Sequence, residues 1–384
     1  MKKLFYTGLA VLAIFEVLKV YFIMPMPGSQ VFDSLEVAYR LHTWRWIIRI
    51  LCGVMIAAGA PAAFRARRKW LVAIPAVLTA VVVWLFTGPA MADHMFQPPR
   101  QLILKPRAEN KLPLSSVVVA VEHNGEAKAY PIRYLIYHHQ VQDTIGGKSY
   151  LVTYCSVCRT GRVFEPLVNG RPEKFRLVGM DHYNAMFEDA TTGSWWRQAT
   201  GEAVAGPLKG TVLRDAMYTQ LTLREWFALH PAGLVMQPDP AALDEEDYDV
   251  FGRYEHGKSR GDLTRTDPLS WQDKSWVIGV QVGTAAKAYD WNRLKQLRVI
   301  NDEVGGKPIV LALADDGQGY VAFERPAPSR EFTLAHDILS ADGQAYDFSG
   351  RNLAAPADRL APVRAHQEFW HSWRTFHPGT MRFR

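Results

Sequence analysis

The sequence predicts an α+β, β-rich fold made of two related lobes and preceded by three transmembrane helices. Three long apolar stretches occupy the first 91 residues, one segment recurs 159 residues later, and both copies combine branched apolar runs with glycine turns. The predicted domains are a membrane anchor over 1–92, a first lobe over 93–236, a linker over 237–270 and a second lobe over 271–384.

The apolar stretches run over Leu4–Met24, Trp46–Phe64 and Trp70–Ala90. Each is long enough to cross a hydrocarbon core, which requires about 20 residues in a helix. Basic residues flank the first stretch at Lys2-Lys3 and fill the turn Arg65–Lys69 between the second and third. The positive-inside rule makes both flanks cytoplasmic, and three crossings then place the remaining chain on the periplasmic or extracellular side of a cytoplasmic membrane.

Three charged residues fall inside these stretches, where an isolated charge is costly. Glu16 and Lys19 are three positions apart on one helix face, which favours a local ion pair, and Arg49 lies in the second stretch. A functional role in the membrane is the alternative interpretation.

An internal repeat organises the rest of the chain. Ser116–Glu165 aligns without a gap on Ser275–Glu324, and 14 of the 50 positions are identical. Each copy has two runs of strand-forming residues around a Gly-Gly turn, which predicts a hairpin. A second echo places Trp226 and Trp373 in short helices near the end of each lobe.

The two copies differ most where the second strand of the hairpin ends, because only the first copy has two thiols and an imidazole. A function confined to the first lobe is the simplest explanation. Cys155, Cys158 and His138 stand opposite Ala314, Gly317 and Leu297.

A Cys-x-x-Cys pair either forms a disulfide or holds one soft metal ion. A closed four-cysteine zinc site is excluded within one chain, because the only other cysteine is Cys52 in an apolar stretch. A mixed site completed by His138 or His139 remains open. The alternatives are a thiol redox pair and an inert disulfide. In thioredoxin-like redox proteins the motif usually lies at the start of a helix, whereas the residues after Cys158 indicate a turn and a strand.

A second candidate region follows the cysteines. Met180 and His182 carry the thioether and imidazole groups that suit copper, and Trp195 and Trp196 are aromatic residues that could line a groove. Core methionines and a surface histidine are the alternative interpretation. A groove between the lobes would be lined by Tyr183, Trp195 and Trp196. The possible additional site residues are His139, Met180, His182, Asp189 and Trp196.

Composition excludes some classes of function. The net charge of +6 is modest and partly due to the anchor, and no basic run with interleaved aromatics indicates a nucleic-acid partner. Phosphate-binding loops, nucleophile elbows and zinc-protease helices are absent from the sequence. A lipid bilayer is the expected partner, together with an unidentified small ligand, metal donor or redox partner.

These motifs resemble the uncharacterised bacterial family DUF3179 over nearly all of Ser115–Phe383, repeat included. This sequence has His139, Ser156 and Arg159 where the family pattern has Glu, Pro and Gly. The resemblance implies that the fold unit and the thiol site are retained, and it leaves the reaction open. The matching residues are Lys128–Pro131, His138, Asp143, Gly146-Gly147, Thr153–Cys155, Cys158, Asp189, Thr192–Ser194, Trp196 and Gln198.

The expected function is therefore an extracytoplasmic site at His138, Cys155 and Cys158 that binds a transition metal, copper before zinc, for metal handling or redox maintenance. The alternatives are a membrane-tethered thiol–disulfide oxidoreductase and a non-catalytic binding module with a groove between the lobes.

Overall fold

The computed structural model describes the backbone of residues 1–384 and every side chain except that of Glu245. It has the mixed α+β, strand-rich architecture that the sequence predicts. The chain divides into two compact units, which we call the anchor unit and the main unit. The anchor unit comprises Met1–Gln97, Lys174–Arg197 and Glu202–Val212, and the main unit comprises Pro98–Glu173, Gln198–Gly201 and Leu213–Arg384. The division into an anchor, two lobes and a linker stays a prediction.

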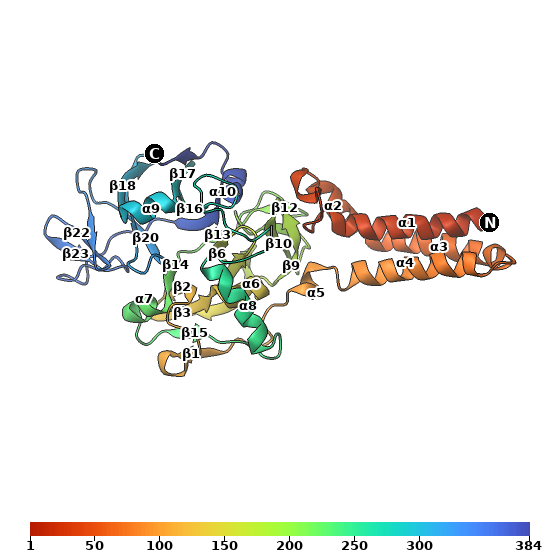
Figure 1. Ribbon diagram of the computed structural model, residues 1–384, viewed down its shortest axis with the longest axis horizontal. Coiled ribbons are helices and arrows are strands. Elements are labelled where there is room, and N and C mark those ends of the chain that lie inside the picture. The colour runs from red at the N-terminus through yellow and green to blue at the C-terminus, as the bar shows by residue number, and fades with distance from the viewer. The chain divides into compact units, whose positions relative to one another are not determined.

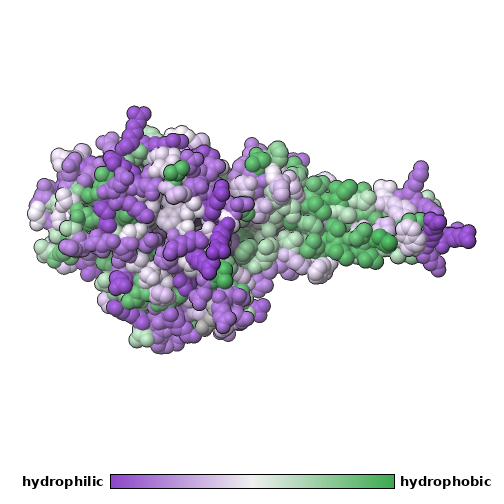
Figure 2. Space-filling model, viewed as in Figure 1, coloured by the Kyte–Doolittle hydropathy of each residue, from purple (hydrophilic) through white to green (hydrophobic). Residues whose placement is uncertain are grey.

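Three helices of the anchor unit are long and apolar enough to cross a membrane: α1 (Lys2–Tyr21), α3 (Arg45–Phe64) and α4 (Trp70–Thr87). They lie side by side (Figure 1), and apolar side chains cover the bundle up to the polar end near the N-terminus (Figure 2). Gly59 permits the closest approach, since a Cβ there would lie 2.4 Å from the backbone nitrogen of Phe5. The helices are therefore candidate membrane spans.

The charged residues of the spans form one cluster. The Lys19 ammonium lies 2.9 Å from a Glu16 carboxylate oxygen, which confirms the local ion pair. Arg49 donates to the two Glu16 carboxylate oxygens from its Nε and Nη2 atoms, at 2.6 and 3.0 Å. Lys19 also donates to the Phe86 carbonyl oxygen at 3.0 Å. The cluster thus links α1 to both α3 and α4, and it leaves Glu16 fully buried among opposite charges.

A small sheet completes the anchor unit, in the order β12-β11-β10-β9. It packs on the segment that follows α1, where Met180 donates from its backbone nitrogen to the Ile23 carbonyl at 2.7 Å. Tyr39 of α2 packs edge-on against Trp195 with 5.0 Å between ring centroids. The remaining elements of this unit are η1 (Ser29–Val31), α2 (Leu35–Thr43), α5 (Ala92–Met95), β9 (Phe175–Asp181), β10 (Asn184–Asp189), β11 (Trp195–Arg197) and β12 (Ala203–Ala205).

An eight-stranded sheet forms the centre of the main unit, in the order β1-β15-β3-β2-β14-β20-β19-β18 (Figure 1). Its inner strands β2, β14, β20 and β19 are largely buried, whereas the edge strands β1 and β18 are partly exposed. Their bounds are β1 (Leu104–Pro106), β15 (Leu234–Met236), β3 (Glu126–Pro131), β2 (Val117–His123), β14 (Thr219–Thr222), β20 (Tyr320–Glu324), β19 (Lys307–Leu313) and β18 (Val299–Val304).

Two four-stranded sheets flank it in the same unit, in the orders β13-β6-β5-β4 and β24-β16-β17-β25. Their strands are β4 (Gln140–Ile145), β5 (Lys148–Cys155), β6 (Thr160–Glu165), β13 (Arg214–Asp215), β16 (Trp276–Val282), β17 (Ala285–Asp290), β24 (Ala365–Phe369) and β25 (Met381–Arg382). Smaller elements are η2 (Arg107–Glu109), β7 (Leu167–Val168), β8 (Arg171–Pro172), β21 (Thr333–Ala335), β22 (Ile338–Ala341) and β23 (Gln344–Tyr346).

The order of elements recurs at the predicted offset of 159 residues. The series β2, β3, α6 (Ile132–His138), β4 has the same bounds, shifted by that offset, as β16, β17, α9 (Trp291–Leu297), β18. The predicted Gly-Gly hairpin is present in both series, as β4 with β5 and as β18 with β19. Superposition of the two segments about a pseudo-twofold axis stays a prediction.

Two further helices recur, α7 (Leu223–Leu229) and α10 (Trp370–Phe376), and both end at the predicted His-Pro pairs. The segment 237–270, expected to be a linker, contains α8 (Glu245–Glu255). Tyr248 of α8 is buried and lies edge-on to Tyr134 of α6, with 4.9 Å between ring centroids. This segment therefore contributes to the core of the main unit.

Candidate functional site

The Cys-x-x-Cys motif forms the turn between two paired strands. Cys155 ends β5, where it pairs with Thr160 at the start of β6, and the backbone enters the left-handed region at Arg159 with φ 54°. Both cysteines are thiols and both are fully buried. The sulfur atoms thus lie in a strand-turn-strand unit and not at the start of a helix, which is where a thioredoxin-like motif places them.

Helix α10 and the residue before the second repeat cover this turn. Phe369, the N-cap of α10, donates from its backbone nitrogen to the Cys158 carbonyl at 2.8 Å. The Lys274 ammonium donates to the Val157 carbonyl at 2.9 Å, and His371 Nε2 lies 3.1 Å from that ammonium and 3.2 Å from the same carbonyl. We call these residues, Cys155–Cys158 with Lys274, His371 and Ser372, the thiol turn.

Burial sets the protonation of the thiol turn. It raises the pKa of Cys158 well above its ordinary value, a neighbouring Cys155 adds to this effect, and the Ser372 hydroxyl opposes it. Burial and the Lys274 charge lower the pKa of His371 to about 4. Without a bound ion, the Cys158 thiol and the His371 imidazole are therefore neutral near pH 7.

A buried ion pair supports the β6 side of the turn. Arg162 Nη2 lies 2.5 Å from Glu368 Oε1, and the same oxygen accepts a hydrogen bond from Thr160 Oγ1 at 3.0 Å. Arg159 points elsewhere: its guanidinium lies 3.4 Å from the centroid of the Trp276 ring and donates to the Glu255 carbonyl at 2.7 Å. The two arginines therefore hold elements around the turn in place.

The two predicted histidines are buried and have partners of their own. His138 Nε2 lies 2.7 Å from the Tyr248 hydroxyl, and His139 Nδ1 lies 3.2 Å from the Tyr137 carbonyl. Burial lowers the pKa of His139 to about 4. Among the described side chains no three His, Cys, Asp or Glu residues are grouped closely enough to hold a metal ion. A metal site formed by His138, Cys155 and Cys158 therefore stays a prediction.

Met180 and His182 belong to the anchor unit. His182 Nδ1 lies 2.7 Å from Asp181 and its Nε2 lies 3.4 Å from Asp33. The hydrogen bond to Asp181 raises the pKa of His182 despite partial burial. This imidazole is thus placed to carry a positive charge between two carboxylates, which does not suit a metal ligand.

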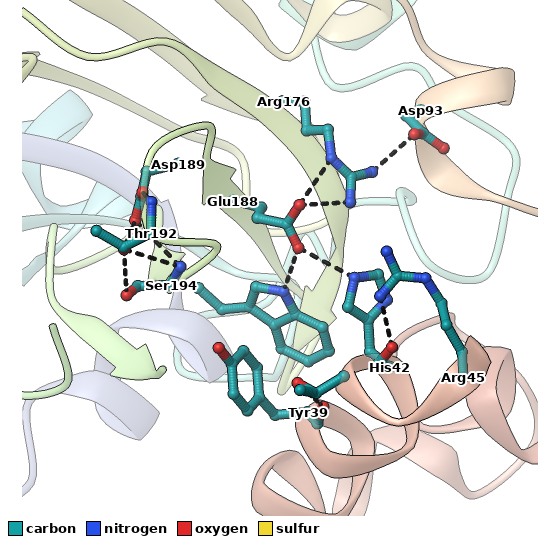
Figure 3. Close-up of polar contacts among 11 residues, drawn as sticks. Tyr39, His42, Arg45, Asp93, Arg176, Glu188, Asp189, Thr192 and Ser194 are labelled. Atoms are coloured by element: carbon teal, nitrogen blue, oxygen red, sulfur yellow. Dashed lines mark hydrogen bonds and ion pairs between the residues drawn. The ribbon is translucent and has the colours of Figure 1, made fainter. Parts of the chain in front are cut away.

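Asp189 and Trp196 close a loop of the anchor unit, as Figure 3 shows for the Asp189 side. The Asp189 carboxylate accepts from the backbone nitrogens of Thr192 and Ser194 at 2.5 and 3.1 Å and from the Trp196 indole nitrogen at 2.8 Å. The family motif in this region therefore fixes a turn.

The neighbouring Trp195 donates to Glu188 at 2.9 Å, and Glu188 also contacts His42 at 3.2 Å and Arg176 at 2.6 Å (Figure 3). These partners outweigh burial and lower the pKa of Glu188 to about 2. Trp195 and Trp196 are fully buried, so the expectation that they line an open groove is wrong. Their hydrophobic rings are used for packing.

Sequence reasoning missed Lys274, His371 and Ser372. Lys274 precedes the aligned repeat by one residue, and His371-Ser372 precedes the recognised Trp373 echo. The echo predicted the helix, but nothing in a single sequence indicated that this helix covers the cysteines.

The fold and the site define a protein with three candidate membrane-spanning helices and a β-rich region that buries a Cys-x-x-Cys pair. The chain belongs to the family described as Protein of unknown function (DUF3179), whose model matches residues 98–380. Neither the curated proteins nor the solved structures contain a match to the chain.

Proposed function

We propose that this protein is a membrane-anchored extracytoplasmic protein in which Cys155 and Cys158 bind copper(I), for metal handling or redox maintenance. The observation that carries the proposal is a pair of fully buried cysteines in one turn, with the Lys274 ammonium bonded to the backbone of that turn. Thiolates are soft ligands and select Cu(I) among the common metal ions.

The fixed charge at the turn favours a monovalent metal ion. Lys274 Nζ has three acceptors around it: the carbonyl oxygens of Val157 and Leu263 and the His371 imidazole. Two thiolates, one Cu(I) and one ammonium have no net charge, and a neutral group is the least costly to bury. Zinc would leave an excess positive charge and would need further ligands to complete its tetrahedral shell.

The thiol–disulfide alternative receives less support. Rapid exchange requires a thiolate, which helix starts and exposed basic surroundings stabilise. Here the sulfur atoms are fully buried and lie between two strands. A protein partner would have no direct access to either sulfur in this conformation.

A Cu(I) titration tests the metal proposal on the full chain in lipid nanodiscs under reducing conditions, with a chromogenic Cu(I) chelator as competitor. We expect about one tightly held Cu(I) per chain. Cys155→Ser or Cys158→Ser should abolish tight binding, and Lys274→Met should weaken it about tenfold because the positive charge that offsets the two thiolates is lost.

Cys52→Ser is the matched control, since it removes a thiol from a candidate span and should leave the affinity unchanged. His138→Ala and His371→Ala test which imidazole contributes to binding: His138, predicted from the sequence, or His371, which lies at the thiol turn. Wild-type affinity no higher than that of the Cys155→Ser/Cys158→Ser double variant would overturn the proposal.

The extracytoplasmic location rests on the basic residues at one end of the helix bundle. Phe5 near the start of α1 contacts Phe64 at the end of α3, with 6.1 Å between ring centroids, so Lys2-Lys3 and Arg65–Lys69 lie at the same end. This is the arrangement that the positive-inside rule requires for two cytoplasmic flanks. A reporter fused after Phe64 should be active only in the cytoplasm and one after Arg384 only outside; the reverse result would contradict the topology.

A further inference from the structure

The eight-stranded sheet splits between β14 and β20. These strands share a single register pair, Gln220 with Tyr320, whereas β14 pairs with β2 over four residues and β20 pairs with β19 over five. Beyond the shared pair, β20 bonds to a following segment, through Glu324 to Ala361 at 2.8 Å and Val363 to Ala322 at 2.9 Å. The divergence opens a cavity of about 410 Å³ inside the main unit.

The walls of this cavity are mainly apolar and aromatic. Trp226 of α7 lines it and is fully buried, whereas the lining residue Met217 is 40% exposed. The volume lies within the usual range for small-molecule sites, which are concave and apolar with few polar groups. Further apolar lining residues are Leu229, Val321, Phe323, Phe348, Leu360 and Val363.

The polar residues of the lining differ in their partners; they are Glu122, Tyr218, Thr219, Gln220, His230, Tyr320, Ser349 and Arg359. Glu122 faces His230, whose Nε2 lies 3.8 Å away. Gln220 donates to Gln367 at 3.0 Å, while its own buried amide oxygen has no partner among the described atoms. Arg359 is exposed, and no described side chain forms an ion pair with it. The lining therefore offers the positive charge of Arg359, together with the Glu122 carboxylate, beside an apolar volume.

We propose that this cavity binds a small aromatic or branched-chain carboxylate. Its apolar body would fill the fork between β14 and β20, and its carboxylate would pair with the Arg359 guanidinium. Aromatic rings of the ligand would pack against Phe323, Phe348 and Trp226. This site is independent of the thiol turn and does not rest on copper binding.

Binding is tested on the full chain in lipid nanodiscs by calorimetric titration with phenylbutyrate, with protein-free nanodiscs measuring partition into lipid. Phenylbutanol and phenylbutylamine have the same body with a neutral or cationic head. We expect the carboxylate to bind more tightly than either. Arg359→Gln should weaken its binding about tenfold through loss of one charge-assisted hydrogen bond, a change of about 1.4 kcal/mol.

Met217→Trp should block binding by filling the mouth of the cavity from an exposed position. Leu353→Trp, at an exposed position outside the lining, and Arg293→Gln, an exposed arginine of α9, are the matched controls and should bind like wild type. Equal binding by Met217→Trp and Leu353→Trp would overturn the site. Equal affinity for phenylbutanol and phenylbutyrate would overturn the carboxylate class.

Discussion

The turn between β5 and β6 and the turn between β19 and β20 stand at equivalent points of the two repeats but have opposite chemistry. The first contains Cys155 and Cys158, which are fully buried. The second contains Asp315, whose side chain is 52% exposed, and Asp316, which accepts hydrogen bonds from its own turn. Turns at equivalent positions of the sequence thus bury thiols in one case and expose a carboxylate in the other.

A short helix lies over each turn. Helix α10 places Ser372 near Cys158, and α7 places Glu225 over the second turn, where a Cβ on Gly319 would lie 2.3 Å from a Glu225 oxygen. Ser372 and Glu225 are separated by the same number of residues as Trp373 and Trp226. Coverage by a short helix is thus common to both turns, whereas the chemistry of each turn is set by a few side chains.

The largest expected effect concerns the buried ion pair beside the first turn. Arg162→Met leaves the Glu368 charge buried without its cation, which should lower the free energy of unfolding by about 3 to 5 kcal/mol. Denaturant unfolding followed by tryptophan fluorescence measures the change. The double variant Arg162→Met/Glu368→Met removes both charges and should recover most of the loss. A single variant as stable as the double one would contradict this account.

The next effect concerns the acidic turn and pH. Burial, followed by the charges of Asp316 and Asp337, raises the pKa of Glu225 from 4.5 to about 8. The folded state therefore holds a proton that the unfolded chain has lost, so stability should fall as pH rises from 4.5 to about 8. Glu225→Gln should remove this fall, a gain of about 1 to 2 kcal/mol at the upper end after allowing for partial exposure.

Unfolding at a series of pH values measures this dependence. Thr222→Ala is the matched control, because it removes the capping bond to the Glu225 backbone nitrogen without changing an ionisable group. It should lower stability by about 1 kcal/mol at every pH. Parallel pH profiles for wild type and Glu225→Gln would show that Glu225 acts only as part of the cap.

The smallest effect is expected at the exposed pair of the second turn. Arg298 lies 2.7 Å from Asp315, and both side chains are partly exposed. Asp315→Asn should change stability by only about 0 to 1 kcal/mol, and high salt should remove even that difference. A decrease in the free energy of unfolding as large as that of Arg162→Met would mean that the charges of the second turn are as deeply buried as those beside the first.

The sequence predicted the strands and hairpins of this fold because they depend on local signals. The Gly-Gly turns fixed both hairpins, and the constant offset between repeats carried the assignment from one to the other. The cysteines were located for the same reason, as the point where two otherwise matching turns differ.

The surroundings of the cysteines depend on distant contacts. His138 was chosen because it precedes the same hairpin, but α6 directs it to Tyr248 on α8, in a segment with weak periodicity. Lys274 and His371 contact Val157 from 117 and 214 residues away. No local pattern specifies such contacts, so they could not be predicted from one sequence.

The small sheet β9–β12 has a practical consequence for obtaining the protein in water. Its apolar face, with Val178, Met186 and Trp195, forms one core with Ile23 and Ala38, which precede the second candidate span. A chain cut after the last span would lose those two residues and leave this face bare, which promotes aggregation. A soluble fragment would therefore need either the stretch 22–43 joined back to the sheet or polar residues on the uncovered face.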